Sequence, residues 1–144
     1  MTNAAGSDAL TAQLHETMPL CATLGFTAEQ FGPDGVVLHV DWAPERCTSG
    51  GLLHGGTIMA LADAAGGACA FFNLPDGAVG TSTIESKTNF FRGVTDGTVT
   101  ATSTALHIGS TTIVVETTLT NTSARGERAV AKVTQTQAVL RPRT

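Results

Sequence analysis

The stretch Gly55-Gly-Thr-Ile-Met-Ala-Leu-Ala-Asp-Ala-Ala-Gly-Gly-Ala-Cys-Ala-Phe-Phe72 contains one charged side chain, that of Asp63. Its length and its apolar composition predict a single helix from about residue 55 to 73, which stops before the turn signal Pro75-Asp-Gly77. A central aspartate and four glycines argue against a membrane span. We therefore expect this helix to be buried inside a soluble domain.

The segments on both sides of this helix have the composition of β-strands. A hairpin is predicted before the helix, where the turn Gly32-Pro-Asp-Gly35 separates two apolar runs. After the helix, short Gly-containing connections separate four Thr- and Val-rich segments, which we expect to form an antiparallel meander. A sheet that curls around the helix would bury it, which is an α+β fold. The six predicted strands are 24–31, 36–42, 79–92, 97–107, 111–121 and 128–140.

The length of 144 residues fits one domain over residues 1–144, with residues 1–20 as an N-terminal helix and extension. Ser7 to Thr17 reads as a helix that Pro19 ends. The net charge of −4 and only eight Lys and Arg residues make nucleic acid an unlikely partner. Three scattered cysteines and a start without a secretory signal indicate the cytoplasm.

Asp63 is the first candidate for chemistry. A carboxylate among Ala, Leu, Ile, Met and Gly side chains must lose water, which is costly unless a reaction uses it or a partner compensates it. We therefore expect a desolvated Asp63 that acts as a base or a nucleophile. The alternative is that Asp63 points to solvent from a half-exposed helix.

Gly55 and Gly56 are the second candidate. Amides at a helix start lack partners within the helix, and glycines allow a carbonyl oxygen to approach them closely. Alternatively, Leu53-His-Gly-Gly56 is only a tight turn into the helix. Asp63 lies roughly 12 Å further along the same helix, so a shared site needs a second copy with an antiparallel helix. We expect a homodimer, in which Gly66 and Gly67 allow close approach or pack on the sheet.

Several motifs together resemble the hotdog-fold acyl-CoA thioesterases of the PaaI type, especially 4-hydroxybenzoyl-CoA thioesterases of the Arthrobacter kind. The resemblance runs from about residue 24 to residue 143. The motifs that carry it are Leu53-His-Gly-Gly56, Ala60-Leu-Ala-Asp63, Ser86-Lys-Thr-Asn-Phe-Phe-Arg92 and His107-Ile-Gly-Ser-Thr111.

This resemblance implies a hotdog fold and hydrolysis of an acyl-CoA to a free acid and coenzyme A. It implies that Asp63 is the nucleophile or the general base, and that the Gly55 amide of the other chain binds the thioester oxygen. The family usually has Asn or Gln seven residues before that glycine, where this chain has Thr48. A hydroxyl can take that role through a water. Thr83 stands where some members place a hydroxyl that orients the water.

The resemblance also implies residues that hold the substrate and its nucleotide. Gly56 leaves room for the ligand, and His54 braces the loop beside it. The nucleotide would contact the turn Gly109-Ser110-Thr111 together with Arg92 and Arg141, which we expect at neighbouring strand ends. Alternatively, that turn is a plain hairpin connection, and Arg141-Pro-Arg143 is a tail.

Other kinds of site have less support. The chain lacks a Gly-x-Ser-x-Gly motif, and its four histidines lack metal-ligand spacing, so we expect no metal and no cofactor beyond the coenzyme A of the substrate. Cys47 and His54 lack a third group for thiol catalysis. Two alternatives remain, an enoyl-CoA hydratase or dehydratase and a non-catalytic acyl-CoA binder. Met59, Phe71, Phe72, Phe90 and Phe91 could line a pocket for an aryl or medium-chain acyl group, but side chains at these spacings more often belong to the plain core. A homotetramer built from two dimers is expected.

Overall fold

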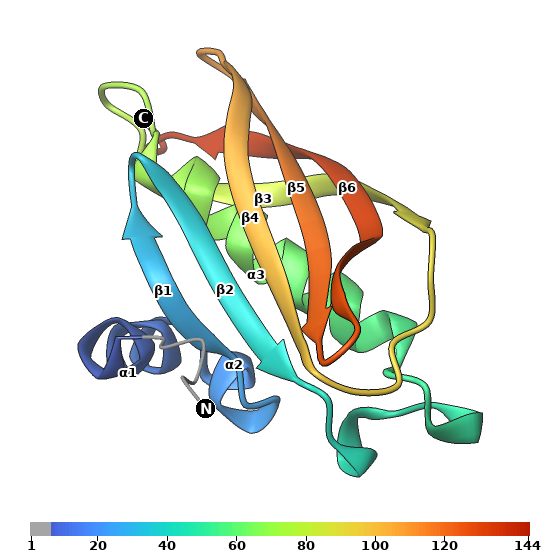
Figure 1. The fold of residues 1–144 in the computed structure, drawn as a ribbon. Helices are drawn as coiled ribbons and strands as arrows, with labels where there is room; N and C mark the ends of the chain where they lie inside the picture. The colour runs from blue at the N-terminus through green and yellow to red at the C-terminus, as the bar shows by residue number, and fades with distance from the viewer. Residues whose placement is uncertain (1–6) are drawn as a thin grey trace.

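The computed structural model describes residues 7–144 as one antiparallel sheet wrapped around a long helix (Figure 1). Residues 1–6, on which the expectation of no secretory signal partly rests, lie outside the described part of the chain. The hotdog arrangement predicted from the sequence is thus confirmed. In chain order the helices and strands are α1 (Asp8–Thr17), α2 (Pro19–Thr23), β1 (Thr27–Gly32), β2 (Gly35–Asp41), α3 (Gly55–Phe72), β3 (Gly80–Phe90), β4 (Thr98–Ile108), β5 (Thr112–Ser123) and β6 (Gly126–Leu140).

Helix α3 is the centre of the domain and has the predicted bounds. It begins at Gly55 because the backbone of His54 is extended and its side chain caps the helix, and it ends at Phe72. By length and by a mean hydropathy of 1.3 this helix meets the criteria for a membrane span, but 56 % of it is buried inside the protein. The apolar composition therefore serves the domain core, as expected.

The sheet order is β1-β2-β4-β5-β6-β3, with every neighbouring pair antiparallel. The predicted meander is correct for β4, β5 and β6 but wrong for β3, which pairs with β6 at the edge. The reason lies in residues 91–97, which are a packed crossing segment and not a tight turn. Val94 in this segment is fully buried, and its carbonyl accepts a hydrogen bond of 2.8 Å from the Leu53 amide.

The N-terminal region covers one end of the sheet. Helix α1 is confirmed, with the Ser7 hydroxyl accepting from the Leu10 amide at 3.4 Å. Pro19 ends α1 as predicted, but it also begins α2, where a proline in the first turn costs no hydrogen bond. The strand predicted from residue 24 starts only at Thr27, because Gly25 takes a positive φ of 71° and closes α2.

The core lies between α3 and the concave face of the sheet. Residues of β5 alternate between this face and solvent, so the buried positions from Ile113 to Leu119 are every second residue. Four buried polar side chains interrupt the apolar core on β4, β5 and β6: Ser103, Thr117, Gln135 and Gln137. Ser103 and Thr117 satisfy each other at 2.6 Å, whereas the two glutamines reach toward α3 and β3.

Candidate active site

Asp63 lies in the middle of α3, on the side that the sheet leaves open. Its side chain is exposed in the single chain, so the predicted desolvation of Asp63 is wrong for the single chain. The sheet covers only one side of the helix, and the neighbours Leu61 and Ala62 take the buried positions. Asp63 Oδ1 accepts two hydrogen bonds, one from the Thr83 hydroxyl at 3.1 Å and one from Gln135 Nε2 at 3.2 Å. The carboxylate is therefore held in place although water reaches it.

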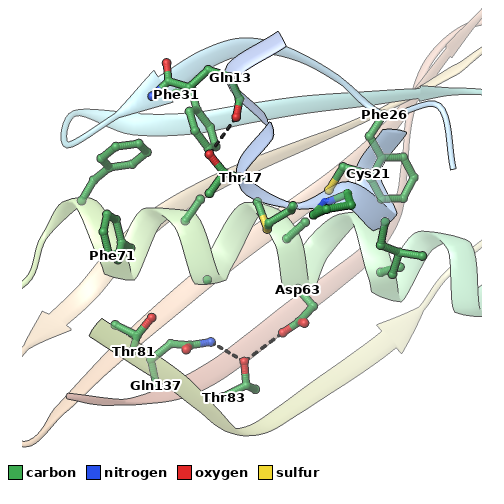
Figure 2. Close-up of a pocket in the computed structure, with 18 of the residues that line it drawn as sticks. Gln13, Thr17, Cys21, Phe26, Phe31, Asp63, Phe71, Thr81, Thr83 and Gln137 are labelled. Carbon is green, nitrogen blue, oxygen red and sulfur yellow. Dashed lines mark hydrogen bonds between the residues drawn. The ribbon is translucent and has the colours of Figure 1, made fainter. Parts of the chain in front are cut away.

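The side chain of Asp63 lines a cavity of about 560 Å³ between the N-terminal helices, α3, β3 and β6 (Figure 2). Its wall is mostly apolar, and Asp63 and Thr83 lie on its polar side. The expected aromatic lining is correct for Phe71 and Phe72. The other three aromatic or Met side chains expected there, Met59, Phe90 and Phe91, are not among the residues that line it. Helices α1 and α2 and the residue between them contribute Gln13, Thr17, Met18, Pro19, Leu20 and Cys21.

The start of α3 leaves one amide available. Of the first four amides, Gly56 donates to His54 Nδ1 at 2.7 Å. Thr57 and Ile58 donate to the His54 carbonyl at 2.9 Å and 3.2 Å. Among the hydrogen bonds of residues 7–144, none uses the Gly55 amide. A free N–H at the positive end of a helix is a donor suited to a carbonyl oxygen that gains negative charge.

The free amide and the carboxylate cannot act on one atom within one chain. Gly55 and Asp63 lie eight residues apart on the same unbroken helix, which corresponds to roughly 12 Å. The ring of Phe90 also lies beside Gly55, where an added Cβ would come within 3.3 Å of Phe90 Cζ. The separation of Gly55 and Asp63 along α3 is therefore the one from which the sequence analysis expected a site shared by two chains.

Thr48 and His54 are separate from the Asp63 cavity within one chain. Thr48 is exposed in the loop before α3, its amide donates to the Leu52 carbonyl at 2.8 Å, and it is not among the residues that line the cavity. His54 lies exposed at the tip of α3 and caps it through Nδ1. This contact gives His54 the bracing role in the loop that the sequence suggested.

The predicted nucleotide contacts are at two different ends of the molecule. Arg141 Nη2 donates to the Ser110 carbonyl at 3.1 Å, which brings it to the Gly109-Ser110-Thr111 turn. Arg92 follows the opposite end of β3, in a polar cleft with Arg125 and Arg128. The expectation of neighbouring strand ends is therefore wrong for Arg92 and Arg141. Because β3 and β6 run antiparallel, the residues after their last positions are separated by the length of β3, roughly 30 Å.

The cysteines do not offer a thiolate to this site. All three are free, and burial raises the pKa of the cavity-lining Cys21 thiol to about 11. Cys69 is buried, which also raises its thiol pKa, and the Cys47 thiol donates to the Ala43 carbonyl at 3.3 Å. Neutral thiols are poor nucleophiles near pH 7. Among residues 7–144, no group of three His, Cys, Asp or Glu side chains is placed to hold a metal ion.

Two residues of the site escaped the sequence reasoning. Gln135 and Gln137 on β6 are 0 % and 1 % exposed, and both point toward the Asp63 region. The signal was present in the run Thr134-Gln-Thr-Gln137, where both glutamines share the strand parity of the buried Val133. Amides at alternate core positions of a strand need polar partners, and such a run therefore indicates a buried polar network.

Comparisons with known proteins agree with the fold. Residues 50–126 match the family model of the thioesterase superfamily. The Mycobacterium tuberculosis protein Rv1847 (MT1895), provisionally called an esterase, is 31 % identical over 100 residues, covering 68 % of this chain and 71 % of the relative. Its solved structure superposes with a TM-score of 0.80 at 26 % identity, covering 88 % of this chain and all of the other.

Two further solved structures are similar over nearly the whole chain. A thioesterase family protein from Silicibacter pomeroyi gives a TM-score of 0.82 at 26 % identity, covering 92 % of this chain and 96 % of the other. A mutant of thioesterase PA1618 from Pseudomonas aeruginosa gives 0.80 at 25 % identity, covering 90 % and 93 %. Both similarities cover more of the chain than residues 50–126, to which the family match is limited.

Proposed function

Since this chain belongs to the thioesterase superfamily, we propose that it hydrolyses an acyl-CoA thioester to a free acid and coenzyme A, as a member of the PaaI type. The observation that carries the proposal is the pairing of an anchored carboxylate, Asp63, with an amide at the tip of the same helix, Gly55, that has no partner among the described hydrogen bonds. One group supplies a base or nucleophile and the other stabilises an oxyanion. Thioester hydrolysis needs both.

In the proposed reaction the carboxylate of Asp63 either removes a proton from water or attacks the thioester carbonyl itself. In both cases the C=O bond becomes a C–O⁻ bond, and the Gly55 amide of a second copy donates to that oxygen. The C–S bond then breaks, and the thiolate takes up a proton, from protonated Asp63 in the base route and from water in the nucleophile route, and leaves as free coenzyme A. The base route gives the free acid at this point. The nucleophile route leaves an acyl–Asp63 anhydride, and water then breaks the bond between its acyl carbon and the Asp63 oxygen, which releases the acid and restores the carboxylate. In both routes water supplies the second oxygen of the acid, so no cofactor is needed beyond the substrate's own coenzyme A.

A dimer across the free edge of β3 is part of the proposal. β3 pairs only with β6, and it presents 11 residues of strand with no neighbour on its other side in the described chain. Two of its side chains are apolar and exposed, Ile84 at 59 % and Phe90 at 48 %, and Val79 directly before the strand is 62 % exposed. A long, unpaired strand edge is a pairing surface that monomeric proteins usually protect. A second copy would cover it, and a tetramer would then form from two such dimers.

The cavity supports an aryl or medium-chain acyl group. Its volume of about 560 Å³ falls within the range of small-molecule sites, and its wall is mainly apolar. Phe71 and the N-terminal residues Met18 and Leu20 form part of that wall. We assign the nucleotide of coenzyme A to two cationic regions that different copies supply. One copy contributes Arg92 after the end of β3, and the other contributes Arg141 after the end of β6, together with the 109–111 turn.

The test of this function is thiol release from a panel of acyl-CoA substrates. We expect the purified protein to release coenzyme A from aryl and medium-chain thioesters, with the maximum rate set by how well the acyl group fills the apolar cavity. Acetyl-CoA, which fills little of it, is the comparison substrate. Release from no thioester of the panel would contradict the proposal, and hydration of an enoyl-CoA would favour the hydratase alternative. Tight binding without turnover would leave a non-catalytic binder.

A further inference from the structure

Two glutamines are buried in the core beside the catalytic candidate, and the fold gives no reason for amides at these positions. Gln135 and Gln137 point inward from β6, between α3 and β3. The inward positions next to them on β6 and β5 are apolar, such as Val133 and Val115. A buried amide is costly unless its donors and acceptors are paired. An apolar side chain of similar volume would serve packing alone at least as well.

The two amides converge on one oxygen of Asp63. Gln135 Nε2 donates directly to Asp63 Oδ1 at 3.2 Å. Gln137 Nε2 donates to the Thr83 hydroxyl oxygen at 2.7 Å, and this hydroxyl donates to the same Oδ1 at 3.1 Å. Figure 2 shows these two hydrogen bonds, from Gln137 through Thr83 to Asp63. Because an amide N–H can only donate, Thr83 must accept from Gln137 and turn its own proton toward the carboxylate.

The arrangement distinguishes the two carboxylate oxygens. Oδ1 receives both donors, whereas no hydrogen bond among residues 7–144 ends on Oδ2 of Asp63. Asp63, Thr83 and Gln137 line the cavity, while Gln135 does not. The donors thus fix one oxygen and leave the other for a ligand.

Gly66 provides the space that this geometry requires. A Cβ added at Gly66 would overlap the side-chain oxygen of Gln135, and the backbone there has no positive φ that would itself favour glycine. Among the described residues, the Gln135 oxygen is buried without a hydrogen-bond partner. An unpaired buried acceptor lowers stability. The side chain is therefore kept in a conformation that costs stability but brings its Nε2 to Asp63.

We propose that Gln135 and Gln137 are positioning residues that lock Oδ1 of Asp63 and present Oδ2 to the thioester or to the attacking water. Gln135 acts directly and Gln137 acts through Thr83. This inference rests on the proposed thioesterase function and deepens it, because it states what aims the carboxylate. Reacting groups must be aligned closely, and a small displacement of one of them costs about 10²-fold in rate.

The test compares Gln135→Met and Gln137→Met with the wild type, using the best acyl-CoA of the panel. We expect kcat to fall about 10- to 100-fold in each variant, with KM changed less than threefold. We also expect Gln135→Met to unfold at an equal or higher temperature, because it removes the unpaired oxygen. A residue with only a structural role would show the opposite pattern, a lower melting temperature with kcat retained. Thr136→Val, between the two glutamines on the outer face of β6, is the matched control and should keep kcat.

Two further comparisons separate the routes. Thr83→Val should lower kcat as much as Gln137→Met, and the double variant should be no worse than either one, because both break the same chain of bonds. In the Asp63→Asn background, Gln135→Met should leave the residual rate unchanged. If the wild type is active and both glutamine variants keep kcat within threefold, the positioning role is wrong while the function stands. If the wild type hydrolyses no acyl-CoA, both proposals fall.

Discussion

Asp63→Asn is expected to lower kcat for acyl-CoA hydrolysis by about 10²- to 10⁴-fold, with little change in KM. The asparagine oxygen can still accept from Thr83 and Gln135, so the side chain stays in place. The amide that replaces Oδ2 can neither take a proton from water nor attack a carbonyl. The measurement is steady-state thiol release with the best substrate of the panel.

The control for this substitution is Asp34→Asn, which makes the same chemical change in the exposed turn between β1 and β2. Asparagine suits turns as well as aspartate does, so this variant should keep the wild-type rate. Circular dichroism and the melting temperature of both variants show whether the fold is intact. An Asp63→Asn protein that keeps more than a tenth of the wild-type kcat would remove the carboxylate from the mechanism.

Gly55→Pro is expected to lower kcat by about 10²- to 10³-fold relative to Gly55→Ala, because it replaces the amide hydrogen proposed to hold the oxyanion with a ring carbon. Proline is favoured at the first position of a helix, and His54 before it has φ −61° and ψ 132°, which a residue preceding proline prefers. No hydrogen bond among the described residues is lost, since the Gly55 amide donates none. The helix should therefore form normally.

Gly55→Ala is the matched control because it adds a Cβ at the same place and keeps the N–H. That Cβ comes within 3.3 Å of the Phe90 ring, a half-exposed side chain that can shift slightly, so we expect a modest loss in this variant. The alanine variant therefore accounts for the effect of the added Cβ, and the further loss in the proline variant reports the replacement of the N–H by a ring carbon. Equal kcat values in the proline and alanine variants, with equal melting temperatures, would show that the amide takes no part in the reaction.

Local signals in the sequence were sufficient for α1, α3 and the approximate positions of the strands, but not for α2 or for the start of β1 at Thr27. The bounds of α3 follow from its apolar run and from Pro75 after its end, and the strands follow from glycine turns such as Gly126. The partner of β3 could not be read in the same way. Pairing with β6 depends on Val94 being buried in a segment that looks like a turn, and that burial is a long-range packing effect.

The candidate site was predictable where one residue type stood out from its neighbours, as Asp63 does in an apolar helix. The exposure of Asp63 in the single chain was not, because the sequence does not say which side of an apolar helix the sheet covers. The glutamines of β6 were missed for a different reason. Their partners, Asp63 and Thr83, lie 72 and 54 residues away in the chain, and only the folded sheet brings them together.

The fixed separation of Gly55 and Asp63 on one rigid helix has a genetic consequence. In a mixed dimer of a Gly55→Pro chain and an Asp63→Asn chain, one site receives both defects and the other receives none. Two alleles that are each inactive should therefore complement one another when expressed together, up to half the wild-type activity in each mixed dimer. Two alleles damaged at the same position should not complement one another. If each site were instead formed within a single chain, no pair of alleles would complement.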